Sequence, residues 1–183
     1  SVEMIKEIYE GINQACKNYN IDLIGGDTSS SMSGLIISVT IIGKSMKEST
    51  TYRSGAKVND LVVVSGDLGA AYLGLQILER EKSIFEAQDL GQPDLTKYSY
   101  VLERQLKPEP RTDMIRLLSK KKIKPTSMID ISDGLASELH HISKSSSVGV
   151  KVFEERIPIN NTTRLVADEL NLNPVSCALN GGE

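Results

Sequence analysis

Two short turns in this chain place carboxylates beside glycine and hydroxyl residues. The first is GGDTSSS, in which Gly25 and Gly26 let the backbone turn tightly and Asp27 follows an expected strand. A carboxylate in such a position is able to hold a metal ion close to a bound ligand. The same residue types also form ordinary turns, in which Asp27 accepts hydrogen bonds from its own backbone. Taken alone, the segment favours the ordinary turn.

The second turn is MIDISDGL, where Asp130 and Asp133 flank Ser132 between an apolar strand and a helix. Ser132 or Asp133 would make a good N-cap, and an acidic side chain is favourable at a helix N-terminus. Capping does not explain Asp130, because a carboxylate in an otherwise apolar strand is costly to bury without a cation. The turn is therefore a candidate metal site.

The chemistry that suits these acids is magnesium-assisted phosphoryl transfer. Magnesium takes one or two carboxylates from the protein and completes its coordination with water and phosphate oxygens. The protein mainly positions the phosphates and neutralises their charge, so we predict no nucleophilic catalytic side chain. The chain has no Walker A pattern, which excludes a P-loop. Arg53 is the best candidate phosphate ligand because a guanidinium grips phosphate through two N–H groups, although a surface arginine fits equally well.

Other polar groups carry less weight. The lysines at positions 120, 121, 122 and 124 are expected at a solvated helix end. His140 and His141 are adjacent and face different sides of one helix, so we interpret them as structural. The GDLG segment at 66–69 joins a strand to a helix and could present amide groups to an anion, but as a motif it is weak.

These turns need strands and helices to position them. Residues 2–19 carry apolar side chains at helical spacing, which predicts an amphipathic helix. Short apolar runs predict strands at 21–25, 35–43, 61–65, 128–132 and 148–153, and helical periodicity predicts helices at 70–81, 94–106, 112–120, 135–145 and 163–170. The polar passage 44–60 is the best domain boundary. The sequence thus predicts an α/β (α+β) protein with domains at 1–52 and 53–183.

Composition narrows the classes of function. The chain has 183 residues, 21 of them basic and 24 acidic, so its net charge of −3 offers no positive field to nucleic acid or to an anionic membrane. No apolar run is long enough to cross a bilayer, and the first residues lack the apolar stretch of a signal peptide. Cys16 and Cys177 are far apart and suit reduced thiols, which predicts a cytoplasmic location.

Five blocks of the sequence occur together in the order and spacing of one enzyme family. They are IGGDTSSS, LIISVTIIGK, RSGAKVNDLVVVSGDLG, IDISDGLASEL and ALNGGE. Together they resemble the bacterial thiamine-monophosphate kinases over nearly the whole chain. Any one block alone would fit only the wider superfamily of aminoimidazole ribonucleotide synthetase and selenophosphate synthetase.

The resemblance implies ATP-dependent phosphorylation of thiamine monophosphate to thiamine diphosphate, by direct in-line transfer with several Mg²⁺ ions in a cleft between two domains. It implies the aminoimidazole ribonucleotide synthetase-like fold and a homodimer, in which 1–52 belongs to the ATP-binding, dimer-forming domain and 53–183 is an α/β domain truncated at its end. By motif it assigns ATP contacts to Gly26, Asp27, Arg53 and Ser132, magnesium contacts to Asp27, Asp130 and Asp133, and a thiamine contact to Glu183.

The sequence also departs from the family pattern. The second threonine of the usual GGDTT is Ser29, which keeps a hydroxyl. The GDDA-type segment with its further magnesium acids and the DYEL continuation after Glu183 are absent, and the chain begins at Ser1 rather than methionine. We therefore expect a fragment that is inactive alone. Two alternatives stay open: another ATP-using member of the same superfamily, and a non-catalytic nucleotide-binding or dimerisation module.

Overall fold

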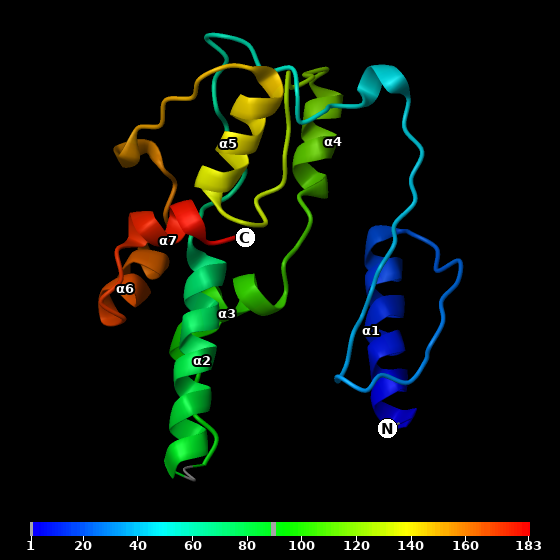
Figure 1. Cartoon of the computed structure of the whole chain (residues 1–183), viewed down its shortest axis with the longest axis vertical. Coiled ribbons are helices and arrows are strands. Elements are labelled where there is room, and N and C mark those ends of the chain that lie inside the picture. Colours follow the sequence, from blue (N-terminus) through cyan, green and yellow to red (C-terminus); the bar gives the residue numbers. More distant parts are fainter. Residues whose placement is uncertain (1, 89–90) are drawn as a thin grey trace. The chain divides into compact units, whose positions relative to one another are not determined.

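The computed structural model of the chain describes residues 2–88 and 91–183 (Figure 1). Its backbone contacts divide into two compact units, Ser1–Lys44 and Ser45–Glu183, which we call unit 1 and unit 2. Ser1, where the predicted fragment begins, lies outside the described residues. The division into domains at 1–52 and 53–183 stays a prediction.

Unit 1 is built on one amphipathic helix, α1 (Val2–Tyr19). Ile5, Ile8 and Ile12 are half-buried along one stripe, at the spacing of three and four residues that a helix requires. The helix ends where Asn20 adopts a left-handed φ of 54°, a conformation common just after the last helical residue. The helix predicted over 2–19 is confirmed.

The rest of unit 1 has no regular helix, and its two predicted strands are not formed. Within residues 2–88 and 91–183 the structure assigns no β-strand, so the strands predicted at 21–25 and 35–43 are corrected to irregular backbone. Ile36 and Ile41 are accordingly 73% and 78% exposed. A strand needs a neighbour that takes up its N–H and C=O groups and covers its apolar face. The apolar pattern predicts that the segment prefers an extended conformation, but it does not predict that a neighbouring strand is present.

Unit 2 is a helical assembly around one long helix. This is α2 (Ala70–Gln88), which packs along α3 (Ser99–Leu106). The other elements are η1 (Lys47–Ser49), η2 (Thr96–Tyr98), α4 (Thr112–Lys120), α5 (Leu135–Ser146), η3 (Glu154–Arg156), α6 (Asn161–Glu169) and α7 (Pro174–Asn180). α6 and α7 contact the α2 helix, and α5 contacts α7 (Figure 1).

Most helix predictions in unit 2 are confirmed, whereas the strand predictions at 61–65, 128–132 and 148–153 are corrected to irregular backbone. The helix predicted at 94–106 is divided into η2 and α3, and the short helix α7 was not predicted. α7 does carry a start signal, because the Asn173 side chain accepts a hydrogen bond from the Ser176 N–H at 2.9 Å and Pro174 opens the helix.

Two apolar clusters form the core of unit 2. The first joins α2, α3, α6 and α7 through buried side chains such as Leu73, Val101 and Val166. The second joins the start of α2 to α5 and α7 through Leu68 and Leu135, among others. α7 contributes buried residues to both clusters, whereas α2 contributes to the first and Leu68, in the segment just before α2, belongs to the second.

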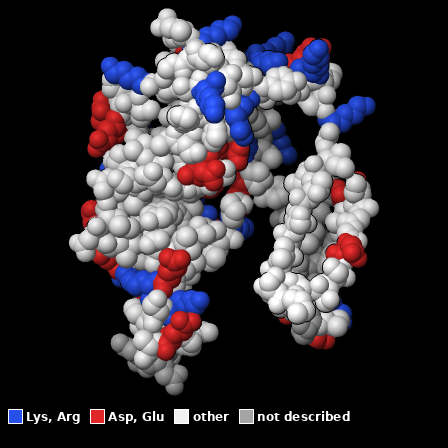
Figure 2. Space-filling model, viewed as in Figure 1, with Lys and Arg blue, Asp and Glu red and all other residues white. Residues whose placement is uncertain are grey.

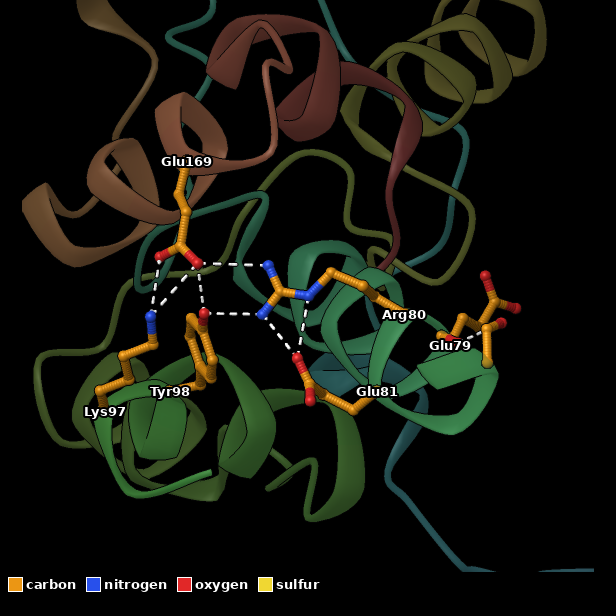
Figure 3. Close-up of polar contacts among 7 residues, drawn as sticks. Glu79, Arg80, Glu81, Lys97, Tyr98 and Glu169 are labelled. Atoms are coloured by element: carbon orange, nitrogen blue, oxygen red, sulfur yellow. Dashed lines mark hydrogen bonds and ion pairs between the residues drawn. The ribbon is translucent and has the colours of Figure 1, made fainter. Parts of the chain in front are cut away.

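A cluster of polar side chains joins α2, η2 and α6 through hydrogen bonds and ion pairs (Figure 3). The Arg80 guanidinium on α2 donates to the hydroxyl of Tyr98 and to the Glu81 carboxylate, both at 2.7 Å, and to the Glu169 carboxylate on α6 at 3.2 Å. The Tyr98 hydroxyl in turn donates to Glu169, and Lys97 pairs with the same carboxylate. We call these five residues the Arg80 cluster. It ties α2, η2 and α6 together.

Candidate functional site

An open hollow of about 490 Å³ lies in unit 2 between the ends of several helices. It is lined by residues of α2 and α3 and by two of the turns that the sequence singles out. The lining residues are Ala71, Tyr72, Leu75, Arg104, Gln105, Pro108, Ser132, Asp133, Asn180, Gly181, Gly182 and Glu183. We call this the site hollow.

The 130–133 turn and the 181–183 turn meet at the hollow. The Glu183 N–H donates to the Ile131 carbonyl at 2.8 Å. A Cβ on Gly182 would lie 1.9 Å from the Ser132 carbonyl oxygen, so only glycine permits this approach. The structure therefore brings Ser132, Asp133 and Glu183, which are far apart in the sequence, to one wall.

The acids of the 130–133 turn are not used as helix caps. The N-cap of α5 is Gly134, and it makes no side-chain cap hydrogen bond. Instead the buried Glu138 side chain accepts from the Asp133 N–H at 3.1 Å. Asp130, like Ser132 and Asp133, is exposed, which corrects the expectation that Asp130 is a buried charge. The turn thus presents its carboxylates and hydroxyl to solvent.

Arg53 lies on a segment that forms hydrogen bonds with Ser127 and Met128, just before the 130–133 turn. The Tyr52 carbonyl accepts from the Met128 N–H at 3.0 Å, and the Arg53 carbonyl accepts from the Ser127 hydroxyl at 2.5 Å. The Arg53 backbone is thus held beside Ser127, three residues before Asp130, while the Arg53 side chain is exposed. This placement leaves the guanidinium able to bind a phosphate.

Glu183 is held by an arginine that the motifs do not contain. Its carboxylate pairs with the Arg104 guanidinium at 2.8 Å, and its side chain is only 8% exposed. Burial raises the pKa of Glu183, while Arg104 and the backbone N–H groups of Gly69 and Ala70 lower it in part. Those amide groups do not give Glu183 Oε1 a hydrogen bond of normal geometry, and this oxygen is buried without a partner. The end of the GDLG turn thus lies near the Glu183 side chain, and the binding of a ligand anion by this turn stays a prediction.

Arg104 is itself part of a network on α3. Its guanidinium also donates to the Asp67 carbonyl at 3.0 Å, and the Tyr100 hydroxyl donates to the Asp67 carboxylate at 2.8 Å. Burial, followed by the bond to Asp67, raises the pKa of Tyr100 to about 12, so the hydroxyl remains a donor at neutral pH. Burial lowers the pKa of Arg104, but pairing with Glu183 outweighs burial and the net shift is upward.

Gly26 and Asp27 belong to unit 1, where both are exposed. The predicted magnesium set therefore draws on both units, and the set as a whole stays a prediction. Among the residues that the structure describes, no three His, Cys, Asp or Glu side chains form a group able to hold a metal ion. Asp130 and Asp133 fit the requirements of magnesium individually, because they are exposed carboxylates in one turn with no side-chain partner in the described ranges.

Sequence reasoning missed Arg104 and Tyr100 as parts of this region, and it singled out the 66–69 segment without a role for the Asp67 side chain. Arg104 and Tyr100 lie in an ordinary amphipathic helix, and their spacing of four residues, which puts them on one face, was the available signal. On the face of unit 2 drawn in Figure 2, basic side chains lie next to acidic ones, in line with the nearly balanced composition.

Comparison with known proteins first gives the fold class of the chain. Residues 1–45 match the family model of the AIR synthase related protein, N-terminal domain. A structure described as AaThiL complexed with AMPPCP and TMP is similar to the whole chain, with a TM-score of 0.76 and 26% identity over 54% of that protein. The crystal structure of thiamine monophosphate kinase from Aquifex aeolicus gives a TM-score of 0.75 and 25% identity, again with all of this chain and 57% of that one. The fold is that of the AIR synthase-related proteins, an α/β (α+β) class.

Curated relatives then name a family to which the chain is similar. The thiamine-monophosphate kinase of Bacillus subtilis is 38% identical over 179 residues, which are 98% of this chain and 51% of the relative. The kinase of Aquifex aeolicus is 31% identical over 182 residues, 100% of this chain and 55% of the relative. Over nearly its whole length the chain is similar to thiamine-monophosphate kinases, and it spans about half the length of the curated relatives it matches. In the described residues no helix is long and apolar enough to span a membrane.

Proposed function

We propose that the whole protein transfers the terminal phosphoryl group of ATP to thiamine monophosphate, which gives thiamine diphosphate and ADP. The observation that carries the proposal is the meeting of the 130–133 and 181–183 turns at one hollow, in a chain 38% identical to a thiamine-monophosphate kinase. An acid-bearing turn and a buried carboxylate on one wall suit a site that takes both a metal-bound nucleotide and a polar acceptor.

In the proposed reaction, an oxygen of the acceptor's phosphate forms a bond to the γ-phosphorus of ATP. The bond from that phosphorus to the β,γ-bridging oxygen breaks at the same time, and ADP leaves. No side chain is covalently modified, so the chain's residues act by holding the two substrates in line. This agrees with a site hollow whose lining residues offer carboxylates, hydroxyl groups and the Arg104 guanidinium but no activated nucleophile.

The residue roles follow the motifs. Magnesium, when bound, supplies the positive charge that offsets the phosphates during transfer, and Asp27, Asp130 and Asp133 would hold it. The nucleotide contacts are proposed for Gly26, Asp27, Arg53 and Ser132, and the acceptor contact for Glu183. The exposure of Asp130, Ser132 and Asp133 supports these roles, because the groups are accessible to ligands.

Location and assembly are also proposals. Cys16 and Cys177 are both free thiols, which suits the reducing conditions of the cytoplasm. A homodimer formed through the N-terminal domain follows from the family resemblance, and sedimentation of the whole protein would test it.

The test is turnover by the whole protein. Purified protein with ATP, MgCl₂ and thiamine monophosphate is expected to form thiamine diphosphate and ADP in equal amounts, measured by chromatography and a coupled ADP assay. ATP consumption only with an amine-bearing ribonucleotide or with selenide would instead favour another member of the superfamily. Nucleotide binding by calorimetry without any turnover would favour the non-catalytic module.

Asp130→Asn is the informative variant in this assay. We expect a loss of kcat on the order of 10²-fold, because the exchange removes a charge that would sit on the metal-bound phosphates. The exposed side chain predicts little loss of fold, within about 0.5 kcal/mol. Asp168→Asn on α6, an equally exposed acid outside the site hollow, is the matched control and is expected to leave the rate unchanged. An unaltered rate for Asp130→Asn at limiting magnesium would remove this residue from the site.

A further inference from the structure

We propose that Arg104 is a positioning residue for the acceptor side of the site: its guanidinium holds the Glu183 carboxylate on the wall of the site hollow and joins it to the 66–69 turn. The inference rests on the proposed function, since Glu183 is the residue proposed to contact the acceptor. It adds a residue from α3, which none of the five motif blocks contains.

The geometry gives Arg104 two acceptors from two different turns. One nitrogen of the guanidinium lies 2.8 Å from Glu183 Oε2 and 3.0 Å from the Asp67 carbonyl oxygen. Arg104 is 30% exposed at its side chain and Glu183 is 8% exposed, so the pair is largely shielded from water. A charge-assisted hydrogen bond in such surroundings fixes a side chain more firmly than a surface ion pair does.

The second anchor comes from the same face of α3. Tyr100, one helical turn before Arg104, donates to the Asp67 carboxylate at 2.8 Å. Asp67 is thus bound through its side chain by Tyr100 and through its carbonyl by Arg104. This double contact fixes the 66–69 turn against α3, and Arg104 extends the same rigid arrangement to Glu183.

Arg104 also favours the charged form of the buried Glu183 carboxylate, because its guanidinium lowers the pKa that burial raises. Glu183 has little contact with water, and a carboxylate without a cationic partner in such a place tends to take up a proton. A protonated Glu183 would lose most of its attraction for an acceptor that carries a cationic ring or N–H donors. Arg104 therefore acts through Glu183 and is not expected to touch the reacting phosphates.

The experiment compares Arg104→Met with Arg80→Met in the whole protein. Both variants remove a guanidinium that links separate segments of unit 2, but the Arg80 cluster contributes no residue to the site hollow. We expect Arg104→Met to raise the KM for thiamine monophosphate about 10- to 100-fold, the effect of losing one charge-assisted hydrogen bond. The KM for ATP should stay within about twofold, and Arg104→Lys should recover part of the loss.

Arg80→Met separates positioning from stability. It is expected to lower the thermal midpoint while leaving both KM values unchanged. An unchanged KM for thiamine monophosphate in Arg104→Met, or an equal rise in both KM values, would overturn the inference. If Arg104→Met does not fold, Arg104→Lys alone tests the inference. A KM for thiamine monophosphate in Arg104→Lys equal to that of the wild type would overturn the inference.

A structural readout keeps this inference distinct from the proposed function. If the wild-type protein forms no thiamine diphosphate, the proposed function fails, and crystal structures of the whole protein with Arg104 and with Arg104→Met decide about positioning. A Glu183 side chain displaced from the wall in the variant supports the inference. A side chain that keeps its place without Arg104 overturns it.

Discussion

Two carboxylates of unit 2 pair with arginine in different surroundings. Glu183 is 8% exposed, and burial raises its pKa despite Arg104. Glu169 is 39% exposed, and the Tyr98 hydroxyl, then Arg80 and Lys97, lower its pKa. Burial disfavours the charged form of the first carboxylate and its arginine favours it, whereas the second carboxylate is charged at neutral pH and holds helices together.

The lowered pKa of Glu169 predicts a pH-dependent contribution to stability. A carboxyl whose folded pKa lies below its unfolded value, about 4.3, stabilises the protein above that value and stops doing so as the pH falls through the folded pKa. Glu169→Gln in the whole protein should therefore lower the urea midpoint at pH 7, and the deficit should shrink below about pH 4. The control is Glu103→Gln, because the Glu103 carboxylate is exposed and lies 4.0 Å from the Lys107 ammonium. A deficit that is the same at pH 7 and at about pH 3 would contradict this.

At the scale of elements, the contact of α2 with α3 sets the geometry of the site. α2 starts beside Glu183, and α3 supplies Arg104 and Tyr100. The two helices approach so closely at Gly74 that a Cβ there would lie 2.2 Å from the Val101 carbonyl oxygen. The glycine is therefore a packing residue rather than a weak point of the helix.

Gly74→Ala tests this close approach. In an open helix the exchange would stabilise by about 0.5 to 1 kcal/mol through helix propensity. Here overpacking costs about 1 to 3 kcal/mol, so we expect a net loss, measured as the free energy of unfolding of the whole protein. Gly11→Ala in α1, where a Cβ meets no atom within 4 Å, should cause no loss and is the matched control. A Gly74→Ala protein as stable as the wild type would show that α3 shifts freely.

At the scale of the whole molecule, the two units differ in how much they bury. Both apolar clusters lie in unit 2, and all the buried hydrophobic residues belong to it. Unit 1 contributes a helix without a buried residue and a segment whose isoleucines are largely exposed. Burial of apolar surface is the main source of folding free energy, so the units should differ in independent stability.

Residues 45–183 expressed alone are therefore expected to fold. The fragment should show helical circular dichroism and a cooperative thermal transition, because it keeps both clusters and the Arg80 cluster. Residues 1–44 alone should show little helix, since an isolated amphipathic helix of 18 residues is marginal in water. A gradual, non-cooperative melt of 45–183 would contradict the expectation.

The sequence by itself determined the helices and the candidate ligands of the site. Periodicity of apolar side chains is a local property, and it gave the bounds of α1 and α4 and the start of α5. The motifs likewise named Asp130, Ser132 and Asp133, because glycine, acid and hydroxyl residues in one turn are a local pattern too, and the family resemblance named Glu183. These residues need no distant partner to be recognised.

Only the tertiary structure decided what surrounds those residues. The strands predicted from apolar runs depend on neighbours from elsewhere in the chain, and the described residues contain none that pair with them. The partnership of Arg104 with Glu183 joins positions 79 residues apart, and burial, which raises the pKa of Glu183, is a property of the folded molecule. Contacts between distant segments leave no mark in local spacing, so only the three-dimensional structure assigns Arg104 to this site.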